Sequence, residues 1–428
     1  MRFRTLAAAV MVASAVQISS PVERRIVESI DANNAAALAL LEKVVDINSG
    51  SQNLAGVKAV GDVFRAEFDR LGVQTTWVDG AAFKRAGHLI AEHRGPGPRI
   101  LLIGHLDTVF EPDSPFQKFR RIDERTATGP GVIDMKGGDV IIVYALKALK
   151  AAGVLDAMNV VVVMTGDEED TGEPQALARQ ALVDAAKGAK YAIGFEDGPG
   201  DPRYAVTARR GTSGWKLEVT GAPAHSSQIF RADIGYGAIF EAARILDAFR
   251  TKLAGEEHLT FNPSVIVGGT TVELDTATTR GTAFGKTNVV PEKALVIGDL
   301  RTLSKEQLQH ARETMRTALE GALPHTRAVL SFEDGYPSLA PSEGNARLLA
   351  MYDQASRDLG FGPVEAVSPD RAGAADVSFV ADEVPAIIDG VGLMGHDDHT
   401  PGETADLTTL PSQTKRAAVL LYRLSQPR

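Results

Sequence analysis

Three short apolar runs restrict the fold of this chain more than any other feature of its sequence. They are RILLIGHLDTV at Arg99 to Val109, NVVVVMTG beginning at Asn159, and YAIGFED beginning at Tyr191. Continuous apolar runs of this length are typical of strands that helices cover on both faces. MKGGDVIIVYALKALKAAG, from Met135 on, has the pattern of one such helix. The alternation predicts an α/β fold with a mostly parallel, open sheet and helices on both faces.

Polar residues end each of the three runs. His105 and Asp107 close the first, Asp167 to Asp170 the second, and Glu196 and Asp197 the third. Ligands of open parallel sheets bind outside the carboxyl ends of the strands. We therefore expect these polar side chains to meet in one site.

A different order of segments begins near Gly211 and predicts a second domain. Six segments read in turn as strand, helix, strand, strand, helix and strand: GWKLEVTGAPAH, DIGYGAIFEAARILDAFR, LTFNPSVIVGG, KALVIGDLR, SKEQLQHARETMRTALEGAL and RAVLSFEDG. The order βαββαβ is that of a ferredoxin-like unit. We expect a catalytic domain at residues 21–209 and 331–428, with an inserted domain at residues 210–330.

Helical periodicity predicts three more helices in the catalytic domain. They are Pro21 to about Val45, GDVFRAEFDRLG ending at Gly72, and GNARLLAMYDQASRDLG. VPAIIDG reads as another buried strand. A chain of 428 residues is long enough for two domains.

Composition excludes several functions. The chain has no cysteine, so disulfides, thiolate zinc ligands and a cysteine nucleophile are excluded, and any metal must be held by histidine and carboxylate. The net charge of −10 argues against binding to nucleic acid or an anionic membrane. Outside the N-terminal stretch the sequence has no run of about 18 or more apolar residues, so we expect no membrane span.

The first residues resemble an export signal. MRFRTLAAAVMVASAV contains two arginines, an apolar stretch and Ala13-Ser14-Ala15, which fits an A-x-A cleavage site. The alternative is an amphipathic first helix. With a signal at residues 1–20 the protein would be periplasmic or secreted, which suits a chain without cysteine.

The acidic run Asp167 to Asp170 in GDEED raises a question of charge. Adjacent carboxylates repel and raise one another's pKa unless a cation lies among them. A solvated acidic loop is the usual meaning of such a run. Because this run ends a predicted strand, we favour a metal site in which one glutamate is a ligand and its neighbour is the general base.

Two further motifs contain candidate ligands, each with a structural alternative. His105 and Asp107 would share one face of a strand, as a metal ligand and its orienting carboxylate or as a hydrogen-bonded structural pair. Asp134 lies in the glycine-rich GPGVIDMKGG, as a ligand or as a helix N-cap. We interpret Lys136 as a solvated or capping residue.

GLMGHDDHTPGE, near the C-terminus, carries His396 and His399, either of which could be a ligand, and Glu403 beyond them. The candidate ligands together supply two nitrogen donors and several oxygen donors: His105, Asp134, Glu169, Glu196 and His399. Such a set suits two Zn²⁺ about 3.5–4 Å apart, bridged by one carboxylate and a water.

An ordered set of motifs resembles the di-zinc aminoacylase and glutamate carboxypeptidase family of exopeptidases, which includes exported folate-hydrolysing carboxypeptidases. The motifs are HLDTV, GPGVIDMKGG, GDEED, FED, GTSGW, GAPAHSS, TNVVPEKALVIGDLR and HTPGE, and the resemblance runs from about residue 35 to the end. It implies a zinc exopeptidase-like fold with two Zn²⁺ per chain. The implied metal positions are His105, Glu169, His399, Glu196 or Asp197, and Asp134 as the bridge. Glu168 matches the general base, and Asp107 the residue that orients the site.

The resemblance also implies roles in the inserted domain, which matches a lid and dimerisation domain and thus a homodimer. His225 matches a histidine that stabilises the oxyanion, commonly in the partner's active site. Asn288 and Arg301 match substrate-binding positions, and the guanidinium of Arg301 suits a carboxylate. Outside the insert, Gly373 in RAGAADVSF matches a glycine whose amide can hold a carboxylate. The alternatives are a strand-end histidine, a turn-forming asparagine and a surface arginine.

The sequence departs from the family pattern at three places. Asp197 and Gly198 follow Glu196 where the family usually has Pro-Thr, so either acid could bind metal. Two serines follow His225 in place of Ala-Gly, and Ala374 replaces a frequent Gly or Thr. These departures bear on substrate preference more than on the reaction.

The expected function is hydrolysis of an amide bond next to a free carboxylate in a small peptide, with Glu168 as the base. The alternatives are a deacylase of N-acyl amino acids, a dipeptidase, or a non-catalytic peptide-binding protein. The other histidines have no comparable context, and we interpret them as surface residues: His88, His93, His258, His310 and His325.

Overall fold

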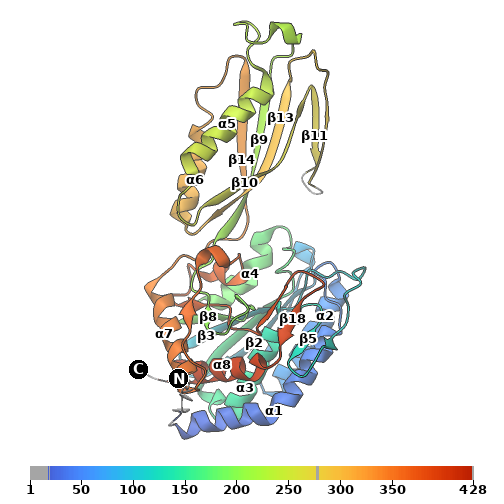
Figure 1. The fold of residues 1–428 in the computed structure, drawn as a ribbon. Coiled ribbons are helices and arrows are strands. Elements are labelled where there is room, and N and C mark those ends of the chain that lie inside the picture. Colours follow the sequence, from blue (N-terminus) through green and yellow to red (C-terminus); the bar gives the residue numbers. More distant parts are fainter. Residues whose placement is uncertain (1–17, 19, 276–278, 427–428) are drawn as a thin grey trace, which may run out of the picture. The chain divides into compact units, whose positions relative to one another are not determined.

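The computed structural model describes residues 18, 20–275 and 279–426 of the chain (Figure 1). The expected export signal, residues 1–20, lies outside the described residues except for positions 18 and 20. Contacts divide the chain into two compact units. Unit 1 contains Met1–Val206, Ser342–Ala366 and Glu383–Arg428, and unit 2 contains Thr207–Pro341 and Val367–Asp382. Among the described residues, no helix is both long and apolar enough to span a membrane.

The end of unit 2 differs from the boundary expected after residue 330. That position lies within strand β14 (Thr326–Asp334), which pairs along its length with β9 (Gly211–Gly221). The chain stays with unit 2 up to Pro341 because the backbones of Arg209 and Leu339 exchange two hydrogen bonds of 2.9 Å.

Unit 1 is built on a six-stranded sheet in the order β1-β2-β6-β3-β7-β16. The strands are β1 (Gln74–Asp79), β2 (Gly87–Arg94), β3 (Arg99–His105), β6 (Asn159–Thr165), β7 (Tyr191–Gly194) and β16 (Ile387–Ile388). β6, β3, β7 and β16 run parallel, and β2 and β1 add an antiparallel edge. The predicted open, mostly parallel sheet is confirmed. The antiparallel edge was not predicted.

Helices surround this sheet. They are α1 (Pro21–Val45), α2 (Leu54–Arg70), α3 (Lys136–Ala151), α4 (Gln175–Ala186), α7 (Glu343–Asp358) and α8 (Thr409–Ser425). α1, α3 and α8 pack against one another, while α4 contacts β6 and α7 contacts β16. α1 begins at Pro21 because the Ser20 side chain caps it, accepting a hydrogen bond from the Glu23 amide. α3 is so apolar that every residue from Val140 to Leu146 is buried.

The register of the central strands brings their carboxyl ends together. β3 lies between β6 and β7, with His105 opposite Thr165 and Ile103 opposite Gly194. The acidic run follows β6 and Glu196 follows β7. The polar residues that end the three apolar runs therefore lie at one edge of the sheet, as expected for parallel strands.

Short elements complete unit 1. β4 (Arg120–Arg121), β5 (Thr126–Thr128), β17 (Gly395–His396) and β18 (Thr404–Asp406) form a small sheet, and β8 (Tyr204–Ala205) pairs with β15 (Glu365–Ala366). Among the described residues, unit 1 has the 3₁₀ turns η1 (Ala81–Phe83) and η2 (Leu155–Ala157), and unit 2 has η3 (Ser226–Gln228), η4 (Pro369–Arg371) and η5 (Asp376–Val380).

Unit 2 is a four-stranded antiparallel sheet in the order β10-β13-β9-β14. Along the chain, β9 is followed by α5 (Gly237–Leu253), β10 (Thr260–Gly269), β13 (Lys293–Thr302), α6 (Lys305–Thr317) and β14. This is the predicted βαββαβ order. A hairpin of β11 (Thr271–Asp275) and β12 (Arg280–Phe284) was not predicted, because β12 is exposed along its length and has no apolar alternation.

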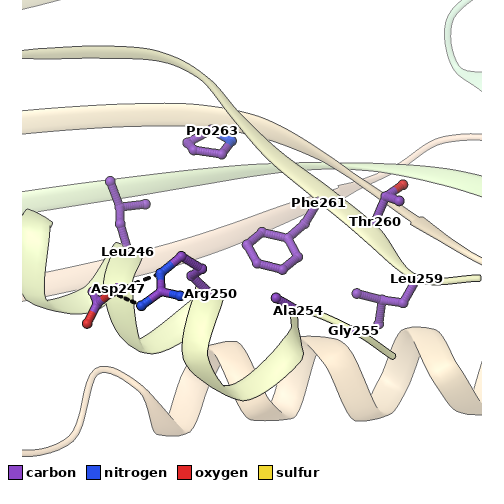
Figure 2. A pocket seen from close by; sticks show the side chains of 9 residues that line it. All are labelled: Leu246, Asp247, Arg250, Ala254, Gly255, Leu259, Thr260, Phe261 and Pro263. Atoms are coloured by element: carbon purple, nitrogen blue, oxygen red, sulfur yellow. Dashed lines mark hydrogen bonds and ion pairs between the residues drawn. The ribbon is translucent and has the colours of Figure 1, made fainter. Parts of the chain in front are cut away.

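A hollow of about 600 Å³ lies in unit 2 between the end of α5 and β10 (Figure 2). Leu246, Leu259 and Phe261 are among its apolar lining residues. Its charged lining residues, Asp247 and Arg250, pair with each other at 2.8 Å. None of the predicted site residues lines this hollow, so the candidate chemistry lies elsewhere.

Candidate metal centre

His105 is held at the end of β3, almost completely buried. Its Nε2 atom lies 3.0 Å from Asp134 Oδ1 and 3.6 Å from Glu196 Oε1. Its Nδ1 atom lies 3.1 Å from the backbone oxygen of Asp107, which suits donation of the ring proton on that side. Nε2 is then left to face the two carboxylates as a ligand atom.

Asp134 joins two histidines through its two carboxylate oxygens. While Oδ1 contacts His105, Oδ2 lies 2.8 Å from Nε2 of His399. The same His399 nitrogen lies 3.1 Å from Glu169 Oε2. A carboxylate with one oxygen toward each of two imidazoles has the placement of a bridging ligand.

Two groups of metal-ligating atoms occur among the described residues, and both contain Asp134. One is completed by His105 and Glu196, and the other by Asp398 and His399. The first group contains Glu196 and not Asp197, so the geometry favours Glu196 of the two acids left open by the sequence. Asp398 was not predicted. Its position beside His399 in GHDDH is the signal that could have identified it.

Asp107 holds the backbone of the acidic run. Its carboxylate accepts hydrogen bonds from the amides of Glu168 at 3.0 Å and Glu169 at 3.1 Å, and from Ser51 Oγ at 2.5 Å. Because Asp107 also lies beside His105, one buried carboxylate fixes the proposed base, a proposed ligand and a histidine relative to one another.

Glu403 was named in the sequence analysis without a role, and the structure supplies one. Its fully buried carboxylate accepts hydrogen bonds from the amides of Gly131 and Ile133, both at 2.9 Å, and of Asp134 at 3.3 Å. This one side chain therefore ties the segment that carries His399 to the loop that carries Asp134. Its spacing after a histidine is not informative without the structure.

The sequence suggested that a metal cation neutralises the acidic run. In the structure, arginine side chains also balance part of its charge. Its first member, Asp167, pairs with Arg179 at 2.6 Å, and its last, Asp170, pairs with Arg85 at 2.8 Å. Of the two inner members, Glu169 lies beside His399, with Oε2 at 3.1 Å from Nε2.

Burial and mutual repulsion shift the pKa values in the centre. Burial, together with the charge of Asp134, raises the pKa of Glu169 to about 7. Hydrogen bonds to Asp134 and Glu169 raise the pKa of His399 to about 11. Burial alone would raise the pKa of Asp134, but hydrogen bonds from His105 and His399 outweigh it and lower that pKa. Burial also raises the pKa of Glu196 well above its usual value.

The remaining predicted residues lie in unit 2. The segments of His225 and Asn288 are neighbours, since the amide of Ser226 donates to the Asn288 oxygen at 2.9 Å. His225 is exposed, and its Nδ1 atom lies 2.8 Å from Ser227 Oγ. Arg301, on β13, is partly exposed and contacts Asp299 at 3.2 Å. The backbone oxygen of Gly373 accepts a hydrogen bond of 2.8 Å from Arg209 Nη1, in the same unit.

Two interpretations of surface residues are wrong. His88 is fully buried, because β2 places it against α4, where its Nε2 atom lies 2.7 Å from the backbone oxygen of Ala178. Lys136 is also fully buried, and its Nζ atom donates to the backbone oxygen of Ile47 at 3.0 Å. Burial lowers the pKa of Lys136 to about 7.

The donor set fits divalent metal ions. Imidazole nitrogen and carboxylate oxygen are the ligands of zinc in proteins that lack thiolates at the site. Glu169 Oε1 is buried and has no hydrogen-bond partner among the described residues, a state that costs free energy unless a cation or donor satisfies it. Asp134, Glu169 and Glu196 crowd negative charge that such a cation would neutralise.

Two histidines and several carboxylates around Asp134, at the carboxyl ends of a parallel sheet, form a donor set of the kind that metal-dependent hydrolases use. The chain belongs to peptidase family M20/M25/M40, whose family model matches residues 101–424. It is therefore a metal-dependent enzyme of the peptidase and amidohydrolase class, and the resemblance noted from the motifs is confirmed.

Relatives support this assignment. The chain is 27% identical to carboxypeptidase G2 of Pseudomonas sp. (strain RS-16) over 402 residues, which covers 91% of this chain and 89% of that protein. The fold matches aminopeptidase PepT of Bacillus cereus with a TM-score of 0.74 and 18% identity, covering 92% of this chain and 99% of that one. It also matches a dinuclear metal binding peptidase of the M20 family from Bacillus subtilis with a TM-score of 0.65 and 18% identity, covering 92% and 99% of the two chains.

Metal affinity should depend on pH through Glu169 and His399. Both must lose a proton to act as ligands, and their pKa values in the metal-free protein are about 7 and about 11. We therefore expect Zn²⁺ to bind more tightly to the metal-free protein at about pH 8 than at about pH 6, with proton release. Titration calorimetry in buffers of different ionisation enthalpy measures both. Constant affinity without proton release would contradict these ligands.

Proposed function

We propose that the protein is a glutamate carboxypeptidase-like exopeptidase that hydrolyses the amide bond next to a free carboxylate. The observation that carries this proposal is the meeting of His105, Asp134 and His399 at the carboxyl ends of the sheet, beside Glu168. The similarity to carboxypeptidase G2, along most of both chains, supports the carboxypeptidase class within the family.

The proposed cofactor is two Zn²⁺ per chain. The residues that would hold the ions are His105 and Glu196 on one side, Glu169 and His399 on the other, and Asp134 between them. When bound, such ions polarise the scissile carbonyl and lower the pKa of the attacking water.

The side chains of the site would move the proton. Glu168, whose backbone Asp107 holds in place, would accept the proton of the attacking water and then donate it to the leaving amine. Burial raises the pKa of Glu196, and the charges of Asp134 and Glu168 add to this shift. The family resemblance also implies that His225 stabilises the oxyanion and that Asn288, Arg301 and the amide of Gly373 bind the substrate.

Replacement of Glu168 tests the proposed base. Glu168→Gln keeps the size and the backbone hydrogen bond but cannot accept the proton, so kcat should fall by about 10²- to 10⁴-fold. Zn²⁺ content, measured by elemental analysis, should stay that of the wild type. Near wild-type turnover in this variant would remove Glu168 from the role. If the wild-type protein binds peptide but binds no zinc and hydrolyses no peptide, the result would favour a non-catalytic binding protein.

Substrate profiling tests the specificity. We expect Zn²⁺-loaded protein to release glutamate from short peptides with a C-terminal glutamate faster than it deacylates N-acetyl amino acids, because Arg301 and Gly373 are proposed to hold a terminal carboxylate. The released amino acid is identified by mass. Faster deacylation, or cleavage restricted to free dipeptides, would assign the protein to the other activities of its family.

We also propose a homodimer formed through unit 2. Phe240 and Ile239 are exposed on α5, at 50% and 44% of their surface, and Phe230 packs its ring against that of Phe240. Ile266, 54% exposed, lies on β10, an edge strand of the sheet. Exposed apolar side chains on a helix and on the strand that it contacts are typical of a surface that a second subunit covers.

A charge on this face should separate the subunits. Phe240→Glu would bury a carboxylate in the proposed interface, so we expect it to shift the protein from dimer to monomer in light scattering after gel filtration. Val329→Glu, at an equally exposed position on the opposite edge strand β14, is the control and should remain dimeric. A monomeric wild type at micromolar concentration would contradict the proposal.

Export is proposed from residues 1–20 alone. The apolar stretch between two arginines and Ala13-Ser14-Ala15 supports it.

A further inference from the structure

The acidic run divides into an inner and an outer pair of carboxylates. The outer pair, Asp167 and Asp170, is bound by arginines, while the backbone of the inner pair, Glu168 and Glu169, is bound by Asp107. The two arginine contacts differ in environment. Asp167 is fully buried, whereas the Asp170 side chain is 54% exposed.

The buried contact closes the whole turn that follows β6. Asp167 Oδ1 accepts from Arg179 Nη1 at 2.6 Å, and Oδ2 accepts from the amide of Gly172 at 2.8 Å. Arg179 Nη2 donates back to the backbone oxygen of Asp167 at 3.0 Å and to Thr171 Oγ1 at 3.2 Å. One guanidinium therefore holds both ends of the segment in which Glu168 and Glu169 lie.

His88 fixes the chain where it enters this segment. Its Nε2 atom faces the backbone oxygen of Ala178, so the ring proton belongs there, and Nδ1 accepts from the amide of Gly166 at 3.2 Å. The ring stacks on Phe83 at 5.0 Å between centroids. Nδ1 also lies 3.9 Å from Asp167, so the neutral ring and the ion pair form one buried assembly.

We propose that the buried Asp167–Arg179 pair, braced by His88, is a positioning device for the metal centre and the base. The pair holds the residues on either side of Glu168 and Glu169, at Asp167, Thr171 and Gly172. Asp107 holds the amides of the two glutamates themselves. Hydrogen bonds of the assembly go to Gly166, Thr171, Gly172 and the backbone of Asp167, which flank the two glutamates, so it acts through the run. The proposal rests on the proposed function only in naming Glu168 as the base and Glu169 as a ligand.

A purely structural role would have a different signature. Arg179 lies in α4, so loss of the pair could simply loosen that helix. In that case the variant would be less stable, but its folded fraction would bind Zn²⁺ as the wild type does. A positioning role predicts weaker metal binding in protein that is still folded. Replacing a residue that holds a metal ligand in place typically lowers metal affinity or activity about 10- to 100-fold.

The experiment uses full-length protein and Zn²⁺ alone as the probe. Asp167→Asn removes the charge at constant size, and Arg179→Lys keeps the charge but loses the two-pronged contact. The control is Arg416→Met, since Arg416 is also buried and bonds to Ser356 Oγ at 3.1 Å, within α7 and α8. The measurements are the Zn²⁺ dissociation constant by competition with a chelator, the visible spectrum of the Co²⁺-loaded protein, and the thermal midpoint.

We expect Asp167→Asn to weaken Zn²⁺ binding about 10- to 100-fold, to change the Co²⁺ spectrum and to lower kcat with little change in KM. Arg179→Lys should recover part of the affinity. Arg416→Met should lower the thermal midpoint without changing the affinity or the spectrum.

Unchanged Zn²⁺ affinity and Co²⁺ spectrum in both Asp167→Asn and Arg179→Lys would overturn the proposal, whatever their stability. If Asp167→Asn does not fold, Arg179→Lys decides by the same criterion. Failure of the proposed function looks different. A wild type without amide hydrolysis would refute the function, while the affinity and the spectrum would still test whether the pair positions Glu169.

Discussion

The carboxylate of Asp134 between two imidazoles is the contact on which the centre depends. Its oxygens lie 3.0 Å from His105 and 2.8 Å from His399, and these residues come from the end of β3 and from a loop near the C-terminus. Glu403 holds the backbone of the Asp134 loop from within the C-terminal segment. The first and last parts of unit 1 are thus joined at the site by hydrogen bonds, and the sheet supplies the fixed edge against which both are placed.

Charge explains why this contact belongs to a metal centre. In the metal-free protein, burial raises the pKa of Glu169 to about 7, and hydrogen bonds to Asp134 and Glu169 raise that of His399 to about 11, so protons on these two groups offset part of the negative charge. Divalent cations would displace these protons and neutralise the same oxygens. The supporting charges are of another kind, because Asp167 pairs with the guanidinium of Arg179. Protons on Glu169 and His399 can therefore be exchanged for metal ions, whereas the charge of Asp167 is balanced by a side chain of the protein.

Much of this could be predicted wherever one local rule decides the outcome. The start of α1 follows from a serine cap and a proline, and the three central strands follow from uninterrupted apolar runs. The convergence of His105, the acidic run and Glu196 follows from parallel strands sharing a carboxyl edge. Residues without such a rule were missed or misread. His88 lies on a strand that was not predicted, and Glu403 acts on a loop that is distant in the sequence.

The sequence by itself determined the fold class, the peptidase family and the residue types that meet at the site, because hydrophobic periodicity and ordered motifs are local properties. Only the tertiary structure decided which acids of the run pair with arginines. The four carboxylates of GDEED are equivalent in the sequence, and Arg179 and Arg85 make them different by binding Asp167 and Asp170. Ion pairing of this kind depends on distances between side chains from separate elements, and those distances exist only once the chain has packed.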